Sequence, residues 1–525
     1  MKLLPLLALL LGTSLSAVEP YDLLIVHGQV YDGTGAPAIA TDIAIEGDRI
    51  VRVGALSGAT AKRTIDARGL AVAPGFIDLH AHLEPLERMP DAESAVRQGV
   101  TLAVGGPDGG GPWPMGDYLA RVEKLPLGCN VAFFTGHNTI RRMVLKMADR
   151  APKPEELERM QKMVEQAMLD GAFGLSTGLK YLPGAYSKID EVIALSRSAA
   201  VHGGIYTSHL REEGVGLLEG VAEAIEIGRS AGIPIILTHH KAIGQKMWGA
   251  SERTLAMVDA ARAEGIDVMM DQYPYTASYT NITVLLPSWS RAGGDKAFAK
   301  RCADPEERAR IRAAVEEAIR TDRGGGDMRR IQFSVVKWKP DLAGRTLYDW
   351  CVERGLEPTI PNGAELVIEA ALKGGCGCVF HAMDEGDVER IMRHPQTMIA
   401  SDGRLSRPGE DQPHPRNYGT FPRVLARYVR ERQVITLENA IFKMTAQPAR
   451  RLGLVDRGRI AEGLVADLVI FDPATVRDRA TFEKPHQYPE GIPYVIVNGA
   501  VTVDDGQFTA ARAGRVLRGP AWKKQ

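Results

Sequence analysis

Two histidines stand one residue apart at the end of an apolar run, within the segment PGFIDLHAHLEP at 74–85. Residues i and i+2 of a β-strand point to the same face, so His80 and His82 would face one common space if 76–79 is a strand. Imidazole nitrogens bind Zn²⁺ and similar divalent ions, so this pair could hold a metal. The same pair could also be two polar side chains at an ordinary strand end. A metal site would need further ligands from elsewhere in the chain.

Other apolar segments end in residues of the same chemical kind. One histidine follows GGIYTS, a second begins HHK after PIILT, and an aspartate follows TMIAS. A random scatter of the chain's 12 histidines would not place four of them at three such ends together with an aspartate at another. The joint pattern therefore predicts a metal site. Its candidate ligands are His80, His82, His209, His239 and Asp402.

A metal at such a site indicates a reaction class. A bound divalent ion lowers the pKa of water and polarises a carbonyl oxygen. Asp402 is then placed to take the proton of the attacking water and to give it to a leaving nitrogen. The predicted chemistry is hydrolysis of an amide or a related C–N bond.

Eight apolar segments alternate with helix-like stretches and supply the strand ends. The candidate strands are 75–80, 100–105, 130–135, 172–176, 203–208, 234–238, 267–271 and 397–401. This α/β alternation predicts a TIM-like (β/α)8 barrel, in which the chemistry takes place at the C-terminal ends of the strands. An open doubly wound sheet would need a glycine-rich phosphate loop after an early strand. The glycine-rich GGPDGGG at 105–111 lacks the GxGxxG spacing, and no helix opens on it.

The two ends of the chain have a different pattern from the middle. Short alternating segments with Gly and Asp-Gly turns predict strands in 18–73 and again in 451–525. We expect these two parts to form one small β-sandwich domain around the barrel at 74–450. Residues from about 284 to 378 exceed an ordinary connection, so they predict an insertion over the mouth of the barrel, where lids and substrate pockets occur.

Charge and composition narrow the possible partners. The 525 residues are 45% hydrophobic and 25% charged, as in ordinary soluble proteins. A net charge of -1, with 6% aromatic residues and no basic-aromatic interleaving, favours a small-molecule substrate over nucleic acid or an anionic membrane. The sequence carries no indication of the oligomeric state.

The first residues have the composition of a targeting segment. Lys2 precedes an apolar run of about ten residues and a small-x-small site that ends at Ala17. Residues 1–17 are therefore predicted to be a signal peptide, with a buried N-terminal helix as the alternative. No later stretch is apolar and long enough for a membrane span, so we expect an exported protein, periplasmic or secreted. The five cysteines are interpreted as mostly buried small hydrophobic residues.

Several longer motifs resemble those of a known family. The strand-end histidines and Asp402 are similar to the ligand set of the amidohydrolase superfamily. The chain resembles its N-acyl-D-amino-acid deacylases over essentially the whole mature length. The segments that carry this narrower resemblance are GLSTGLKYLPG, HLREE, THHK, DQYPYTAS, GRTLYDW and HPRNYGTFPRVL.

The resemblance implies a role for each matching residue. His80 and His82 would bind one metal with Asp402, which would also act as general acid and base. His209 and His239, the latter preferred over His240, would bind a second ion, with zinc as the expected metal. The residues implied for the substrate's carboxylate or side chain are Lys241, Tyr273 and Arg416, and a cationic fork suits a carboxylate. By its position after the third strand, His137 is a further candidate for substrate contact.

One position departs from the family pattern. The deacylases place a metal-binding cysteine just after the second strand, whereas this chain has VTLAVGGPDGGGPWP there. The superfamily's other solution is a carboxylated lysine at the end of the fourth strand, where Lys180 stands. We therefore expect a CO₂-derived carbamate on Lys180 to bridge two ions. The alternatives are one bound metal with an ordinary lysine, or Asp108 of the glycine-rich loop as the missing ligand.

The leading hypothesis is a metal-dependent hydrolase that cleaves the amide bond of N-acyl amino acids, which the resemblance implies are of D configuration. The closest alternative is a binuclear dipeptidase-like amidohydrolase that acts on small peptides or related amides with a free carboxylate. The missing cysteine suggests it, because a lysine-bridged pair of ions is common among the superfamily's dipeptidases. A barrel that only binds a ligand is a third hypothesis, and it is disfavoured by the intact set of candidate ligands.

Overall fold

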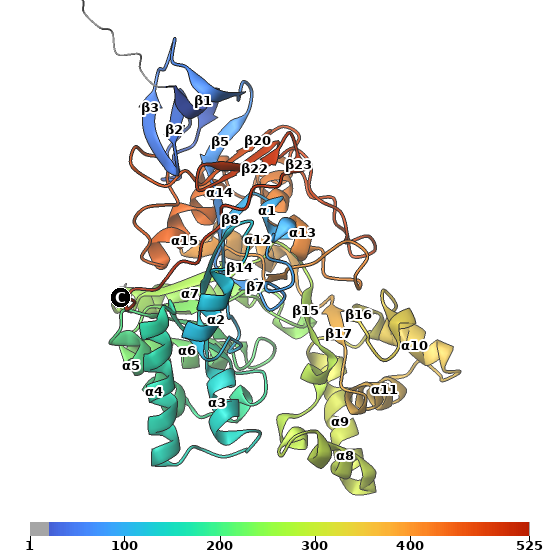
Figure 1. Ribbon diagram of the computed structural model, residues 1–525. Coiled ribbons are helices and arrows are strands. Elements are labelled where there is room, and N and C mark those ends of the chain that lie inside the picture. The colour runs from blue at the N-terminus through green and yellow to red at the C-terminus, as the bar shows by residue number, and fades with distance from the viewer. Residues whose placement is uncertain (1–19, 524–525) are drawn as a thin grey trace, which may run out of the picture.

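A computed structural model describes residues 20–523, and the predicted signal peptide at 1–17 lies outside the described residues. Within this range, parallel strands form the wall of a barrel with eight positions (Figure 1). The strands are β6 (Phe76–Asp78), β8 (Val100–Gly105), β9 (Asn130–Phe133) continued by β10 (Thr135–Gly136), β11 (Gly174–Gly178), β12 (Ile205–His209), β13 (Ile235–Leu237), β14 (Val268–Gln272) and β18 (Thr397–Ile399). Each overlaps one of the predicted segments, and the predicted α/β barrel is confirmed.

The barrel closes where the first and last strands meet at their C-terminal ends. The short strand β7 (Ala81–His82) pairs in parallel with β19 (Gly403–Arg404). Asp402 donates its backbone N–H to the carbonyl oxygen of His80 at 2.9 Å. The carboxylate of Asp78 accepts hydrogen bonds from the backbone N–H and the hydroxyl of Ser401. The closure therefore brings two candidate ligands together from opposite ends of the barrel sequence.

The side chains of each strand alternate between the inside and the outside of the barrel, and this alternation explains how the interior is packed. Leu102 and Val104 of β8 belong to a buried cluster inside the barrel, whereas Ala103 between them belongs to the larger core outside it. Side chains of adjacent residues in a strand point to opposite faces, so one strand serves both cores. The interior is thus packed with apolar side chains, and the polar residues lie at the strand ends.

The helices that cover the barrel present one apolar stripe each. The covering helices are α2 (Met115–Val122), α3 (His137–Leu145), α4 (Pro154–Asp170), α5 (Ile189–Ala200), α6 (Leu217–Ala231), α7 (Ser251–Ala263), α12 (Glu385–Arg393), α14 (Leu437–Met444) and α15 (Ala446–Arg451). In α4 the buried residues are Met160, Met163, Val164, Ala167 and Met168. Their spacing of three and four residues places them on one face. Helix α13 (Arg416–Arg423) follows β19, includes most of the motif HPRNYGTFPRVL, and is buried over Arg416–Pro422.

Both ends of the chain contribute to one nine-stranded sheet at the top of Figure 1. Its strands are β1 (Tyr21–Val30), β2 (Ile39–Glu46), β3 (Arg49–Gly54), β4 (Ala61–Asp66), β5 (Ala71–Pro74), β20 (Leu468–Phe471), β21 (Tyr494–Val497), β22 (Ala500–Asp504) and β23 (Gln507–Phe508). The two halves join where β5 pairs antiparallel with β20. The exact limits of this domain remain a prediction.

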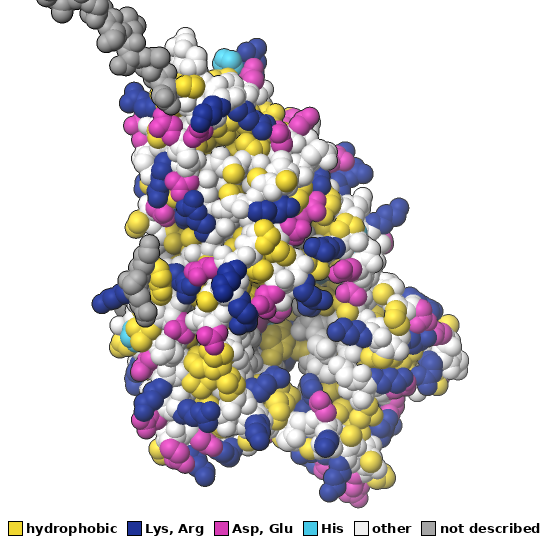
Figure 2. All heavy atoms as spheres, in the orientation of Figure 1, with side chains coloured by type: hydrophobic (Ala, Val, Ile, Leu, Met, Phe, Trp, Pro, Cys, Tyr) yellow, Lys and Arg dark blue, Asp and Glu magenta, His cyan; other side chains and the backbone are white. Residues whose placement is uncertain are grey.

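The long segment between β14 and β18 has a core of its own. It contains the antiparallel strands β15 (Ser278–Asn281), β16 (Ile331–Val335) and β17 (Gly377–Phe380). Its helices are α8 (Asp295–Ala303), α9 (Pro305–Thr321), α10 (Leu347–Glu353) and α11 (Ile360–Leu372). Their buried residues form a cluster that runs from Ile282 to Phe380. Figure 1 shows this insertion as a lobe beside the barrel helices, and Figure 2 shows the surface hollowed between the two.

No helix between residues 20 and 523 combines the length and the apolar character that a membrane span requires. The five cysteines are buried and free, in line with their interpretation as small hydrophobic residues.

A buried carboxylate ties the terminal sheet to the barrel, and its removal is expected to destabilise the fold. Asp467 accepts hydrogen bonds from Arg457 Nη1 at 2.6 Å, from the amide of Asn130 at 3.1 Å and from the backbone of Asn498 at 2.7 Å. We predict that Asp467→Ala lowers the free energy of unfolding by about 3–5 kcal/mol, because Arg457 is left buried without its partner. The measurement is urea unfolding followed by circular dichroism.

Asp456→Ala is the matched control. The half-exposed carboxylate of Asp456 lies 3.2 Å from Nε of Arg457. Loss of this contact should lower the free energy of unfolding by no more than about 1 kcal/mol. Equal stability of the two variants would contradict the role given to Asp467.

Candidate metal centre

The structure brings the five predicted strand-end ligands together at the C-terminal end of the barrel. His80 lies between β6 and β7, His82 is the last residue of β7, and His209 is the last residue of β12. His239 follows β13, and Asp402 lies between β18 and β19. The barrel gathers these ends at one mouth, so residues more than 300 positions apart in sequence meet.

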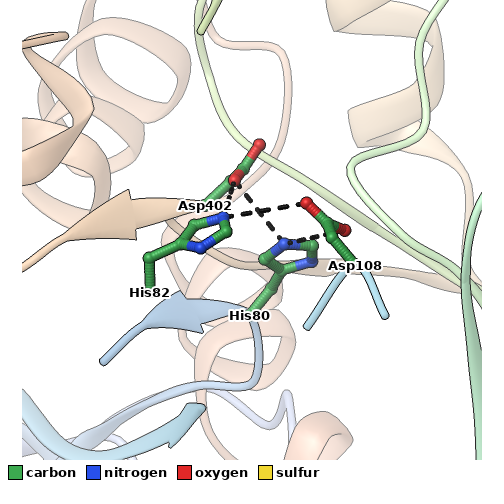
Figure 3. A group of neighbouring side chains, drawn as sticks. All are labelled: His80, His82, Asp108 and Asp402. Carbon is green, nitrogen blue, oxygen red and sulfur yellow. Dashed lines mark hydrogen bonds and ion pairs between the residues drawn. The ribbon is translucent and has the colours of Figure 1, made fainter. Parts of the chain in front are cut away.

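The first group of possible ligands consists of His80, His82, Asp108 and Asp402 (Figure 3). Asp402 Oδ1 lies 3.1 Å from His82 Nε2 and 3.5 Å from His80 Nε2. Asp108 faces the same two rings, at 3.5 Å from His80 Nε2 and 3.7 Å from His82 Nε2. One ligand atom from each residue lies within 4.8 Å of the others, which is compatible with one divalent ion among them.

The second group consists of Asp108, His209 and His239. Asp108 Oδ1 lies 3.4 Å from His239 Nε2 and 3.7 Å from His209 Nδ1. Asp108 therefore belongs to both groups, and its carboxylate could contribute to an ion in either one.

Unpaired polar atoms in this cluster show that a cation fits it. The buried atoms without a hydrogen-bond partner include both ring nitrogens of His80 and His209, Nε2 of His239 and Oδ1 of Asp108. Leaving such groups unpaired in a protein interior costs free energy, and coordination of a cation would satisfy them. Imidazole nitrogens and carboxylate oxygens form a ligand set that suits Zn²⁺.

The backbone at three of these residues is held in a sparsely populated conformation. Asp108, His239 and Asp402 have φ values of 54°, 38° and 49°, in the left-handed region that favours glycine. Such strain is kept at functional sites when the surrounding structure enforces it. Here the strained backbone occurs at three candidate ligands, which belong to the two groups.

Asp108 was only a minor alternative in the sequence analysis, and the glycines around it explain its placement. A Cβ at Gly106 would lie 2.3 Å from the carbonyl oxygen of Phe134, and one at Gly109 would lie 2.2 Å from Asn138 Oδ1. The loop can thus pack closely against the end of the third strand only because it is rich in glycine. The available sequence signal was a single carboxylate in this loop, just after the second strand, where the deacylases place a cysteine.

The charges around Asp402 keep it ionised. Burial raises the pKa of Asp402, but the Arg416 guanidinium and His80 outweigh this effect, and the pKa lies well below its usual range. Arg416 Nη1 donates to Asp402 Oδ2 at 2.7 Å. The pKa of Asp108 is likewise held low against the effect of burial, by His80, His239 and His209. Two ionised carboxylates among histidines make the cluster suitable for cations.

The second histidine of the HHK sequence has a structural role. His240 Nε2 lies 2.8 Å from Thr254 Oγ1, away from the candidate ligands. Burial and the nearby Lys241 lower the pKa of His240 to about 3, so its ring is neutral. This placement agrees with the choice of His239 as the ligand.

The predicted substrate residues Lys241, Tyr273 and Arg416 lie close together and are buried. The guanidinium of Arg416 and the ammonium of Lys241 lie 4.8 and 5.7 Å from the centroid of the Tyr273 ring. Both cations already have carboxylate partners, Asp402 for Arg416 and Glu213 for Lys241. His137 lies apart from them, fully buried, with Nε2 at 2.8 Å from Glu191 and Nδ1 at 3.3 Å from Asn138. Its contact with substrate stays a prediction.

Lys180 is not brought to the candidate ligands. Its Nζ lies 2.9 and 2.8 Å from the two carboxylate oxygens of Glu212, and 3.9 Å from Asp322. This arrangement favours Asp108 over Lys180 as the shared ligand, because an ammonium held by two carboxylates is not free to carry a carbamate. Carboxylation of Lys180 stays a prediction that this arrangement does not favour.

Comparison with known proteins gives the chain its family. The model of the amidohydrolase family matches residues 337–503. A D-aminoacylase of Alcaligenes xylosoxydans xylosoxydans is 37% identical, over 96% of this chain and 99% of that protein. An N-acyl-D-glutamate deacylase of the same organism is also 37% identical, over 95% and 97% of the two chains.

Solved structures agree with this relationship. A crystal structure of N-acyl-D-glutamate deacylase from Bordetella bronchiseptica, complexed with zinc and a phosphonate inhibitor, has a TM-score of 0.82 and 34% identity, over 95% of this chain and all of that one. A D-aminoacylase structure described as having a binuclear metal centre has a TM-score of 0.81 and 36% identity, with the same coverage. This chain therefore belongs to the amidohydrolase family, in the branch of the D-aminoacylases and N-acyl-D-amino-acid deacylases.

Proposed function

We propose that this protein hydrolyses the amide bond of N-acyl-D-amino acids with the help of one or two divalent ions, zinc being the expected metal. The observation that carries the proposal is the pair of ligand groups that share Asp108 beside the ionised Asp402. The whole-length likeness to D-aminoacylase and to N-acyl-D-glutamate deacylase supports this substrate class over the dipeptidase alternative. That alternative depended on a lysine bridge, which the position of Lys180 does not favour.

The proposed ligands divide between the two groups. His80, His82 and Asp402 would hold one ion, His209 and His239 the other, and Asp108 would contact both. Ions held in these groups supply polarisation of the acyl carbonyl and a lowered pKa of water. Asp402, ionised and held by Arg416, is placed to accept the proton of the attacking water and to pass it to the leaving nitrogen.

The buried cations beside the cluster would orient the substrate's carboxylate. Arg416 uses Nη1 for Asp402, but its buried Nε has no partner. Tyr273 lies between Arg416 and Lys241, so all three can contribute to one anion site. Arginine suits this task because its planar fork presents several donors in fixed directions.

A cavity of about 400 Å³, which none of the proposed ligands lines, is separated from His209 by Tyr181 and offers room for part of the substrate. Its walls come from the loop after β11, the loop after β12 and the first part of the insertion. Tyr181 lines this cavity and packs on His209, with ring centroids 4.4 Å apart. We propose that the cavity receives the amino-acid side chain or the acyl group. We further propose that residues 1–17 direct export to the periplasm or out of the cell.

Metal content tests the role of Asp108. We predict that the wild-type protein holds up to two zinc ions per chain and that Asp108→Ala loses at least one, because both groups lose a ligand. The measurement is metal analysis by mass spectrometry after equilibration with zinc. Asp117→Ala, an exposed aspartate in α2, should keep the wild-type content. Full metal content in Asp108→Ala would remove this residue from the ligand set.

Activity tests Asp402. Asp402→Asn should lower kcat/KM for N-acetyl-D-amino acids by about 10²–10⁴-fold, because the amide cannot accept the proton. A panel of N-acetyl-D- and N-acetyl-L-amino acids and dipeptides, each with and without a chelator, checks the substrate class. Turnover of dipeptides alone, or full turnover without metal, would contradict the proposed function.

The variant Lys180→Ala distinguishes Asp108 from a carbamate on Lys180 as the ligand shared by two ions. Because the ammonium of Lys180 lies on Glu212, Lys180→Ala should leave the zinc content unchanged, even when the protein is purified with bicarbonate. Metal analysis of the variant beside wild type is the measurement. A loss of zinc in Lys180→Ala would instead support the carbamate bridge.

A further inference from the structure

A single carboxylate, Glu213, faces both histidines of the second group from the side opposite Asp108. Glu213 Oε1 lies 3.2 Å from His239 Nδ1, and Glu213 Oε2 lies 3.5 Å from His209 Nε2. The other nitrogen of each ring faces Asp108. Each imidazole thus lies between two carboxylates, one on the proposed metal side and one behind it.

If each ring turns its hydrogen toward Glu213, the two rings carry the hydrogen on different nitrogens. A ring nitrogen that donates to Glu213 carries the hydrogen, which leaves the lone pair on the nitrogen that faces Asp108. His209 would therefore carry its hydrogen on Nε2 and His239 on Nδ1. Lys241 Nζ lies 2.7 Å from His239 Nδ1, a distance at which an ammonium donates to that nitrogen. His239 therefore carries its hydrogen on Nδ1 only when Lys241 directs its own hydrogens to Glu213 Oε1 and the His239 carbonyl oxygen. One carboxylate can select both tautomers.

Glu213 is itself held by a residue of the insertion. Arg323, which follows α9, is 2% exposed, and its Nη2 lies 3.1 Å from Glu213 Oε2. Its Nη1 lies 3.1 Å from the carboxylate of Asp322. Among the described residues, Arg323 forms no hydrogen bond to a candidate ligand, so its direct route to the two histidines is the contact with Glu213.

The segment that carries Arg323 is packed tightly against two loops of the barrel. A Cβ at Gly244, whose φ is 87°, would lie 2.7 Å from the carbonyl oxygen of Thr321 and 3.0 Å from that of Asp322. One at Gly214 would lie 3.2 Å from Asp322 Oδ1. Residues 321–323 therefore sit between the loops after β12 and β13, which carry His209 and His239.

We propose that Glu213 is a positioning residue for the second metal group and that Arg323 of the insertion positions Glu213. The insertion is then a structural part of the metal centre in addition to being a wall of the substrate cavity. This inference rests on the proposed function, since it assumes that the second group binds an ion. Partners of this kind orient ligating histidines, and their loss typically weakens metal binding by 10–100-fold.

The first group should be independent of this arrangement. Glu84 lies 3.1 Å from His82 Nδ1, and Asp271 lies 3.8 Å from His80 Nδ1. Among the described residues, Glu213 forms its ion-pair contacts with His209, His239, Lys241 and Arg323 and with neither ring of the first group. Disruption of Glu213 should therefore affect one ion and spare the other. A general loss of stability would not produce such a difference.

The experiment measures zinc affinity at both groups in Glu213→Gln and Arg323→Met. Competition with a chromophoric chelator gives one dissociation constant for each ion. Both variants should bind one ion as wild type does and the other about 10–100-fold more weakly, with an unchanged circular dichroism spectrum. Adding His80→Ala to Glu213→Gln should abolish the remaining tight site, whereas adding His209→Ala should not.

The controls are an exposed carboxylate and an exposed arginine near the two positions. Glu219→Gln in α6 and Arg320→Met in α9 should bind zinc as wild type does. If Glu213→Gln does not fold, the test uses Arg323→Met and the milder Arg323→Lys instead. These variants are suitable because Arg323 forms no hydrogen bond to a candidate histidine. Wild-type affinity at both sites in the folded variants would overturn the inference alone. Absence of zinc binding in the wild-type protein would overturn the proposed function with it.

Discussion

The carboxylate of Asp108 lies between 3.4 and 3.7 Å from a ring nitrogen of each of four histidines, which come from three strand ends of the barrel. A buried anion surrounded by imidazoles is stable only if its charge is balanced, and several of the surrounding nitrogens have no other partner. The neighbouring Asp402 adds a second negative charge. Cations would balance these negative charges. Because Asp108 lies between the two groups, its position decides how many cations it can contact.

Around this centre, each ionisable group is held by another of opposite charge. Arg416 holds Asp402, and Lys241 and Arg323 hold Glu213. Removing one partner of such a buried pair is costly, so the network fixes the directions of the ligands and of the general base together. The same cations lie beside Tyr273, where the substrate's carboxylate is proposed to bind. Positioning of the ligands and recognition of the substrate thus depend on shared residues.

The insertion extends this dependence beyond the barrel. It has its own apolar core, and in other respects it resembles a separate lobe. Yet Arg323 reaches from it to Glu213, and residues 280–291 complete the wall of the cavity beside Tyr181. The insertion contributes both to the proposed support of the ligands and to the wall of the cavity. A change in the insertion that alters substrate preference must therefore also leave the metal centre intact.

The sequence by itself determined the barrel and most of the ligand set. Strand alternation and the regular succession of strands and helices are local patterns, and a parallel barrel necessarily gathers its strand ends at one mouth. His80, His82, His209, His239 and Asp402 could therefore be proposed as ligands from their positions, with the family resemblance selecting His239 over His240. The directions of side chains in loops depend on long-range packing, which no local pattern records. Only the tertiary structure brought Asp108 rather than Lys180 to the candidate ligands, paired Arg416 with Asp402, and connected Arg323 to Glu213. Asp108 and Arg323 meet partners that are distant in the chain, and Arg416 meets Asp402 through the packing of the loop between them, so no local pattern records these contacts.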